Sequence, residues 1–118
     1  MSLDQHRELK DRTKAFALRV IKMSDALPKT RAANVITNQI LRSSTSMAAN
    51  YWAVRRARSR AEFVAKLGVV VEEADETVFW LEMLADSGIV RADKIGKMLD
   101  EANRLMLIFS ASRRTAKR

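Results

Sequence analysis

The sequence SRAEFVAKLGVVVEEADETVFWLEMLADSG, residues 59–88, carries the longest helical pattern in the chain. Ser59 and Glu62 stand three residues apart ahead of an apolar run, which is the spacing of a capping box at a helix start. Gly88 follows the run and is the expected left-handed residue just past the helix end. These signals predict a helix over about residues 60–86. Its apolar face, at steps of three and four residues, consists of Phe63, Leu67, Val70, Ala74, Val78, Leu81 and Ala85.

The two segments before this helix show the same periodicity. Ser2 and Gln5 form a second capping-box pair, and Pro28 ends the apolar stripe that follows, so we predict a helix over about residues 4–26. The next stripe covers residues 36–54, and its middle is rich in serine and alanine. Because small side chains let a neighbouring helix approach closely, we interpret this segment as tightly packed core, with a ligand pocket as the alternative.

A fourth stripe predicts a helix over about residues 91–112, and the basic residues 113–118 beyond it are expected to be disordered. The chain has 118 residues with Gly 3, Pro 1 and Cys 0. This composition indicates one domain with few turns and no disulfide framework. Four amphipathic helices with short connections predict an all-α fold, an antiparallel up-down-up-down four-helix bundle over residues 1–112.

The composition gives little support for catalysis or metal binding. His6 is the only histidine, and the sequence has no glycine-rich phosphate loop. An acidic run, Glu72, Glu73, Asp75 and Glu76, suggests a carboxylate-bridged metal site, but ferritin-like sites combine such acids with histidines. We therefore expect no catalytic residue, no metal and no cofactor. We also expect a cytoplasmic protein, because no segment has the length and apolarity of a membrane span.

Positive charge is the feature that points to a partner. The formal net charge is +8, and residues 28–58 hold six basic and no acidic side chains. In an up-down bundle the connection after the second helix and both chain termini lie at one end, which we call the basic end. Clustered cations bind phosphates, whereas the alternative is a charged surface that only keeps the protein in solution. The expected contacts are Arg55, Arg56, Arg58, Arg60, Arg113, Arg114, Lys117 and Arg118.

Residue counting from the predicted connections places charged side chains at equal heights on neighbouring helices. Arg42 falls level with Asp75, and Arg104 falls level with Glu73. Ion pairs between helices can fix their register. We expect these pairs to be structural.

The predicted helix over residues 60–86 also has a second apolar face. On a helical wheel, Val69, Phe79, Trp80 and Met83 fall opposite the core stripe. An exposed apolar stripe is typical of a partner surface, and the simplest partner is another copy of the chain. The alternative is that Trp80 covers the edge of the core.

Two aromatic residues, Tyr51 and Trp52, precede the basic connection. Aromatic rings beside cations stack on unpaired bases in single-strand binding sites. Their place within a helix of the bundle favours core packing, with base stacking as the alternative.

A set of spaced residues resembles a known bacterial family. The set comprises Asn38-Gln39, Arg42-Ser43, Ser46, Asn50-Tyr51, Ala57, Ser59, Phe63, Lys66-Leu67, Glu73-Ala74, Glu76-Thr77 and Trp80-Leu81. The sequence looks like the four-helix bundle proteins encoded in intervening sequences of large-subunit ribosomal RNA genes, a family that includes the accessory variability proteins of diversity-generating retroelements. The resemblance implies a homopentameric ring with a positively charged surface. For the retroelement branch it implies binding of nucleic acid and of a reverse transcriptase without catalysis.

Single positions extend the resemblance. Arg42 matches the family's arginine, and Glu73 and Glu76 match its acids on the third helix, which fits structural ion pairs. Val54 departs from the acidic residue that many relatives carry near this position, so a role tied to that acid is not expected here.

Two functional hypotheses follow. In the first, an oligomeric bundle without enzymatic activity binds RNA or DNA through the phosphates and does not read base sequence. In the second, the oligomer is a protein-interaction scaffold whose charge keeps it in solution. A third hypothesis, an enzyme with a carboxylate-bound metal, lacks the histidines that it needs.

Overall fold

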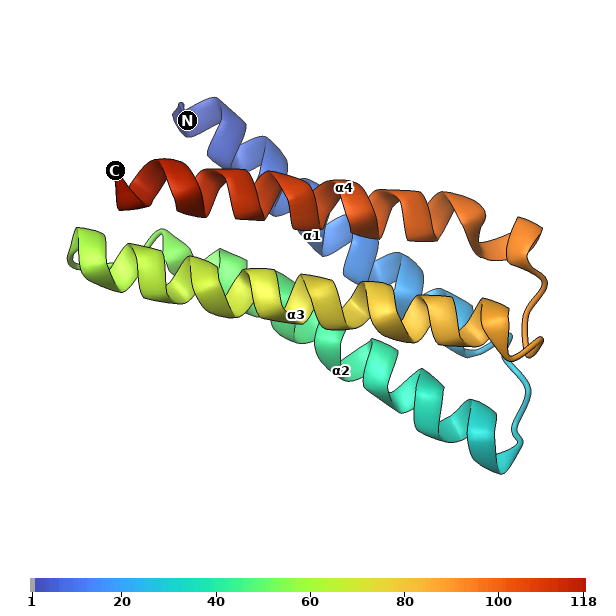
Figure 1. Ribbon diagram of the computed structural model, residues 1–118. Coiled ribbons are helices and arrows are strands. Elements are labelled where there is room, and N and C mark those ends of the chain that lie inside the picture. Colours follow the sequence, from blue (N-terminus) through green and yellow to red (C-terminus); the bar gives the residue numbers. More distant parts are fainter. Residues whose placement is uncertain (1) are drawn as a thin grey trace.

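The computed structural model describes residues 2–118, most of which lie in four α-helices (Figure 1). The helices are α1 (Leu3–Ser24), α2 (Arg31–Val54), α3 (Arg60–Asp86) and α4 (Ala92–Lys117). Each helix reverses the direction of the one before it, so both termini and the connection between α2 and α3 lie at the same end. Within the described residues the fold is all-α, which confirms the predicted class.

The helix boundaries follow their capping residues. At α1 the predicted capping box is present, because the Gln5 N–H donates to Ser2 Oγ at 3.1 Å and the Ser2 N–H donates to Gln5 Oε1 at 2.7 Å. At α3 the box is half formed: the Ser59 hydroxyl accepts from the Glu62 N–H at 3.0 Å, but the Glu62 carboxylate accepts from the N–H of Arg58. Gly88 has a φ of +78°, as its place after α3 predicts.

The structure corrects the expectation of a disordered tail, because α4 continues through Lys117. Two hydrogen bonds fasten these last turns to α3. Arg113 Nε donates to the Val64 carbonyl at 3.3 Å, and Arg60 Nε donates to the Ala116 carbonyl at 2.5 Å. Apolar periodicity ends at about residue 112, so it predicts no helix beyond that point. The contacts that stabilise the helix there are made by polar groups, which the apolar pattern does not include. Cations in the last turn also interact favourably with the helix dipole.

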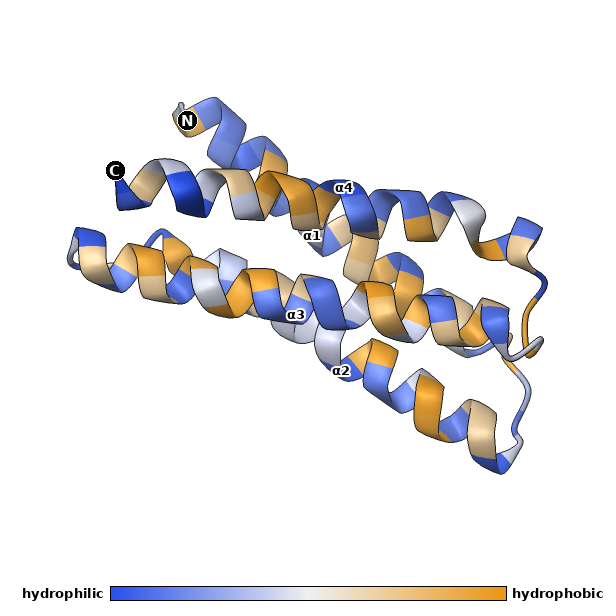
Figure 2. Cartoon of the chain, in the orientation of Figure 1, coloured by the Kyte–Doolittle hydropathy of each residue, from blue (hydrophilic) through white to orange (hydrophobic). Residues whose placement is uncertain are grey.

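The core lies between the inward faces of the helices. Its largest fully buried side chains include Phe16, Ile40, Met47, Leu67, Leu81, Leu84, Leu105 and Phe109. The serine-rich middle of α2, pale in Figure 2, packs closely against α3. Ser43 and Ser44 are fully buried, and Ser43 Oγ lies 2.8 Å from Thr77 Oγ1 in a hydrogen bond between the two helices. The interpretation of this segment as tightly packed core is therefore confirmed.

The bundle is unevenly closed. α2 packs along α3, and α3 packs along α4, whereas α1 contacts α4 over only a short stretch. Figure 1 shows α1 crossing behind α4 at an angle. One hollow lies along this α1–α4 seam at the basic end, and another lies along it at the opposite end.

Candidate nucleic-acid interface

The basic end consists of the α2–α3 connection and the last turns of α4. The hydrogen bonds of Arg60 and Arg113 hold the C-terminal turns of α4 against the first turns of α3. The eight cations predicted to cluster are therefore brought to the same end of the molecule, which Figure 1 shows at its left. In Figure 2 blue, hydrophilic bands alternate with pale and tan ones over the last turns of α4 there.

Arg113 fills a space that a glycine leaves open. A Cβ on Gly68 would lie 3.1 Å from Arg113 Nε and 3.2 Å from Nη2. The Arg113 side chain is half-buried, and its Nε–H is engaged by the Val64 carbonyl. Arg113, together with Arg60, thus joins α3 to α4, which leaves less of these two side chains for a ligand than sequence reasoning assumed.

The other predicted cations are exposed; they are Arg55, Arg56, Arg58, Arg114, Lys117 and Arg118. Arg58 is 90% exposed and forms a loose ion pair with Glu62, with 3.8 Å between Nε and Oε2. Among the described residues the remaining five have no carboxylate within ion-pair distance. Little of the positive charge at this end is neutralised locally, so the charge is available to a polyanion.

Trp52 lies between two cations from different helices. Lys10 Nζ of α1 is 4.5 Å from the centroid of the Trp52 ring, and Arg55 Cζ at the end of α2 is 4.3 Å from it. Both distances are within the range of a cation–π interaction. Trp52 is 38% exposed, so the prediction of core packing is wrong for this residue. For Tyr51, which is buried, the same prediction is confirmed.

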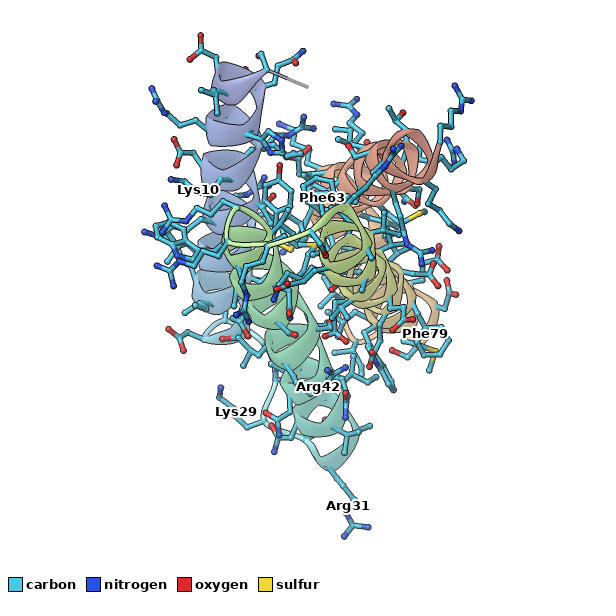
Figure 3. All side chains as sticks on the ribbon, turned by 90° about the vertical axis from the view of Figure 1, so that its left-hand side faces the viewer. Lys10, Lys29, Arg31, Arg42, Phe63 and Phe79 are labelled. Carbon is cyan, nitrogen blue, oxygen red and sulfur yellow. The ribbon has the colours of Figure 1, made fainter. Side chains whose placement is uncertain are left out.

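The cations of α1 were missed by the sequence reasoning. Arg7 and Lys10 line a shallow hollow around Trp52, and Lys10 and Lys14 line a second one with Ala48. Figure 3, which looks onto the basic end, shows Lys10 on the outer side of α1. Their spacing of three and four residues places them on one face of α1, and this periodicity was the available signal. They extend the basic surface from the α2–α3 connection onto α1.

An ion pair marks the place where α1 crosses α4. Arg12 donates twice to the Glu101 carboxylate, from Nε to Oε2 at 2.7 Å and from Nη2 to Oε1 at 2.6 Å. This hydrogen bonding lowers the pKa of Glu101. The bidentate geometry fixes both side chains, so the pair holds the two helices together at their crossing.

The seam hollow at the basic end contains a histidine and a tyrosine. His6 Nδ1 lies 3.0 Å from the hydroxyl of Tyr51. Burial lowers the pKa of His6 and raises the pKa of Tyr51 to about 12. The only histidine of the chain is therefore engaged with a residue of the core, and it favours the neutral form.

Between α2 and α3 the observed ion pairs differ from the counted ones. Arg42 donates to Glu73 Oε2 at 3.0 Å and also binds the carboxylate of Glu76. Asp75, the residue counted as level with Arg42, faces away and is exposed. Residue counting predicts the height along the helix but not the direction in which a side chain points. Glu73 and Glu76 lie on either side of Asp75 along α3, on the face that meets Arg42. Arg42 lies on α2 in Figure 3.

The second counted pair is absent. Arg104 is exposed and, among the described residues, has no carboxylate within ion-pair distance, while Glu73 binds Arg42. The α4 residue that does form an ion pair with another helix is Glu101, which binds Arg12 of α1.

The outer face of α3 carries the expected apolar stripe. Phe79 is 51% exposed, Val69 is 41% exposed and Met83 is 36% exposed. Trp80 differs, because it is half-buried against the core and its Nε1–H donates to Glu76 at 3.3 Å. Trp80 thus covers the edge of the core, while Phe79 packs edge-on against it from outside. Figure 3 shows Phe79 on the side of the molecule away from Lys10.

A second basic surface surrounds the seam hollow at the opposite end. The hollow is an open groove of about 890 Å³ between the end of α1 and the start of α4. Its apolar lining includes Met23, Leu27 and Met98. The charged residues that line it are all basic; they are Arg19, Lys22, Arg91, Lys94 and Lys97.

Metal and membrane sites are not indicated by the part of the chain that the structure describes. Residues 2–118 hold no group of three or more His, Cys, Asp or Glu side chains that could bind a metal ion. None of the described helices is long and apolar enough to cross a membrane.

Known proteins share this sequence pattern and this fold. Residues 5–111 match the family described as 23S rRNA-intervening sequence protein. The chain belongs to this family. A solved structure of a protein with unknown function from the S23 ribosomal protein family of Bacteroides thetaiotaomicron VPI-5482 superimposes with a TM-score of 0.84 and 28% sequence identity, covering 92% of this chain and 97% of that one. No curated protein matches the sequence significantly.

The family match divides the basic end of this intervening-sequence protein into two parts. The α2–α3 connection and the cations of α1 lie within residues 5–111. The basic residues at positions 113–118 lie beyond the match. The surface around Trp52 therefore lies within the matched segment, and the last turn of α4, beyond the match, adds further charge at the same end of the molecule.

Proposed function

We propose that this intervening-sequence protein binds nucleic acid through its basic end and has no enzymatic activity. The observation that carries the proposal is the position of Trp52 between Lys10 and Arg55. Arg55 and the neighbouring Arg56 are exposed and have no carboxylate within ion-pair distance among residues 2–118. The ring holds one cation from α1 and one from the end of α2 at the same surface. A surface of this kind binds phosphates, with arginine supplying paired donors and lysine a point charge.

The proposed binding does not depend on the base sequence of the nucleic acid. Flexible arginine and lysine side chains contact the backbone phosphates, which supply most of the affinity and no base reading. The description of the family refers to 23S rRNA, so RNA is the first ligand to test, with DNA as its comparison. A reverse transcriptase partner, which the resemblance implies for one branch, stays a prediction.

The absence of enzymatic activity is proposed from the way the reactive groups are used. His6 is engaged by the Tyr51 hydroxyl in the seam, and the hydroxyls of Ser43 and Thr77 bind each other in the core. A serine or threonine nucleophile needs a base within hydrogen-bond reach. The base His6 instead faces Tyr51, whose phenol has its pKa raised to about 12 by burial and is thereby disfavoured as a nucleophile. The buried hydroxyls of α2 and α3 instead serve helix packing.

We further propose that the protein assembles with copies of itself through two complementary surfaces. The apolar stripe of α3, with Phe79 and Met83, is flanked by exposed acids; these are Glu72, Asp75, Glu82 and Asp86. The seam groove at the opposite end has an apolar lining and a basic rim. A contact between two different surfaces propagates from copy to copy and closes into a ring when the rotation allows it. The homopentamer implied by the family resemblance is the ring that we propose.

The test of nucleic-acid binding is a matched pair of charge reversals. Arg56→Glu with Arg58→Glu changes the α2–α3 connection, and Lys29→Glu with Arg31→Glu makes the same change in charge at the other end, where Figure 3 shows both residues exposed. We expect the first variant to lose affinity for a labelled RNA at least tenfold, because two phosphate contacts are replaced by repulsion. The control variant should bind nearly as well as the original chain.

Two outcomes would contradict the proposal. If both variants lose affinity equally, the binding depends on net charge and not on the basic end. If the original chain fails to bind RNA and DNA at low salt, nucleic-acid binding is excluded, and the protein-interaction scaffold becomes the favoured function.

A further inference from the structure

The seam hollow at the basic end differs from the surrounding surface. It has a volume of about 630 Å³ and lies between the start of α1 and the end of α4. Its lining includes Tyr51 of α2 and Phe63 and Leu67 of α3. Figure 3 shows Phe63 between α1 and α4, on the side that faces the viewer. The hollow therefore opens at the end where the cations gather.

Three rings give the hollow aromatic walls. The His6 ring is nearly parallel to the Tyr51 ring, with an interplanar angle of 19° and 6.3 Å between centroids. It meets the Phe63 ring edge-on, also at 6.3 Å. Ile108 adds an aliphatic side chain, and Ser112 and Thr115 are polar residues of the lining. Apolar and aromatic walls with a few polar groups are typical of a site for a flat, partly polar ligand.

A cation is fixed at the mouth of the hollow. Ala116 is one of the lining residues, and its carbonyl accepts the hydrogen bond from Arg60 Nε. The other guanidinium nitrogens of Arg60 are not bound by that carbonyl and lie on an exposed side chain. Lys117 follows Ala116 directly and is exposed as well. A ligand whose flat part enters the hollow thus leaves an attached phosphate beside positive charge.

We propose that this hollow receives an unpaired base of the bound nucleic acid. The inference rests on the proposed function and adds a site to it, because a base in the hollow would place its own phosphate beside Arg60. Recognition of single-stranded segments by stacking on aromatic side chains tolerates different bases, since every base has a flat aromatic face. The hollow selects unpaired over paired strands and does not select sequence.

The test compares strands that differ only in their bases. One labelled single strand carries adenines, a second has the same sugar-phosphate backbone with abasic positions, and inorganic polyphosphate serves as a third ligand. The original chain should bind the adenine strand about tenfold more tightly than the abasic strand, the size of effect expected for one stacked base. Polyphosphate binding reports on the cations alone.

A substitution that fills the hollow makes the test specific. Ala111 is an exposed lining residue of α4, so Ala111→Trp blocks the hollow without removing a core side chain. The variant should lose the preference for the adenine strand and keep its affinity for the abasic strand and polyphosphate. Leu18→Trp, at an exposed position of α1 outside the hollow, is the control and should keep the preference.

Each outcome separates this inference from the proposed function. Binding of all three ligands with no preference for bases, or a preference that survives in Ala111→Trp, would overturn the base site and leave phosphate binding intact. Binding of none of them at low salt would overturn both.

A second measurement does not depend on a variant. Photocrosslinking of a strand that contains 4-thiouridine should label the tryptic peptide of residues 61–66, which contains Phe63. The peptide of residues 43–55 contains both Tyr51 of the hollow and Trp52 outside it, so a label there is assigned to one residue by fragmentation. Labels on Trp52, with none on Tyr51 or on residues 61–66, would overturn the site.

Discussion

At the scale of single residues, the cationic side chains fall into two groups, those that join helices and those that are exposed to solvent. Arg12, Arg42 and Arg113 bind acids or carbonyls on neighbouring helices and hold the bundle together. The arginines of the α2–α3 connection lie exposed and have little carboxylate around them. Composition alone could not make this distinction, because it depends on which face of a helix each side chain occupies.

The Arg12–Glu101 pair should make stability depend on pH. Its hydrogen bonds lower the pKa of Glu101 below the ordinary value of 4.5 in the folded protein. The unfolded chain therefore takes up this proton at a higher pH than the folded chain. It follows that the contribution of the pair is complete above the ordinary pKa and is lost as the pH falls through the lowered value.

We expect Glu101→Gln to reduce the free energy of unfolding by about 1 kcal/mol at pH 7. The difference from the original chain should shrink as the pH falls below the ordinary carboxyl pKa. Urea denaturation at several pH values measures it. Asp100→Asn, at an exposed acid next to Glu101, is the control and should change stability little at any pH. A loss in Glu101→Gln that stays constant down to the lowest pH would contradict an ionic origin.

At the scale of helices, sequence reasoning succeeded where apolar periodicity carries the information. The four helices, their order and most of their core residues could be predicted, because the steps of three and four residues are interrupted at Pro28 and Gly88. The last turn of α4 could not be predicted in this way, since Arg60 and Arg113 stabilise it through hydrogen bonds between helices. The seam hollows could not either, because they result from the angle at which α1 crosses α4, which a periodic pattern does not contain.

Two glycines inside helices provide a test of the contact between α3 and α4. A Cβ on Gly96 would meet no atom within 4 Å, so Gly96→Ala should stabilise the protein by about 0.5–1 kcal/mol through helix propensity alone. A Cβ on Gly68 would displace the Arg113 side chain, so Gly68→Ala should gain clearly less. Denaturant unfolding of both variants compares them. An equal gain at the two positions would show that the packing of Arg113 against Gly68 contributes nothing.

At the scale of the whole molecule, the proposed assembly requires the outer face of α3. Phe79→Asp places a charge in the middle of the apolar stripe without removing a core residue, whereas Trp80 packs against the core and is a less specific target. We expect light scattering to show a particle of several times 13.4 kDa for the original chain and a smaller one for Phe79→Asp. Leu107→Asp, at a side chain that is 62% exposed on α4, should leave the mass unchanged. An unchanged mass for Phe79→Asp would contradict an interface on the outer face of α3.

The basic end is the other surface that concerns the whole molecule, because it combines residues from α1, from the α2–α3 connection and from α4. Sequence reasoning found the second and third groups through their runs of arginine and lysine. It missed Lys10, whose place beside Trp52 depends on how α1 packs against α2. The charge of this surface is the basis of the proposed function.

The most direct measurement is the affinity of the original chain for a labelled single-stranded RNA across a series of salt concentrations, made on a sample of known particle mass. If the exposed cations of the basic end contact at least four phosphates, the logarithm of the association constant should fall against the logarithm of salt with a slope of about −3 or steeper. An affinity that does not change with salt, or no binding at the lowest salt, would contradict nucleic-acid binding by the cations of the basic end.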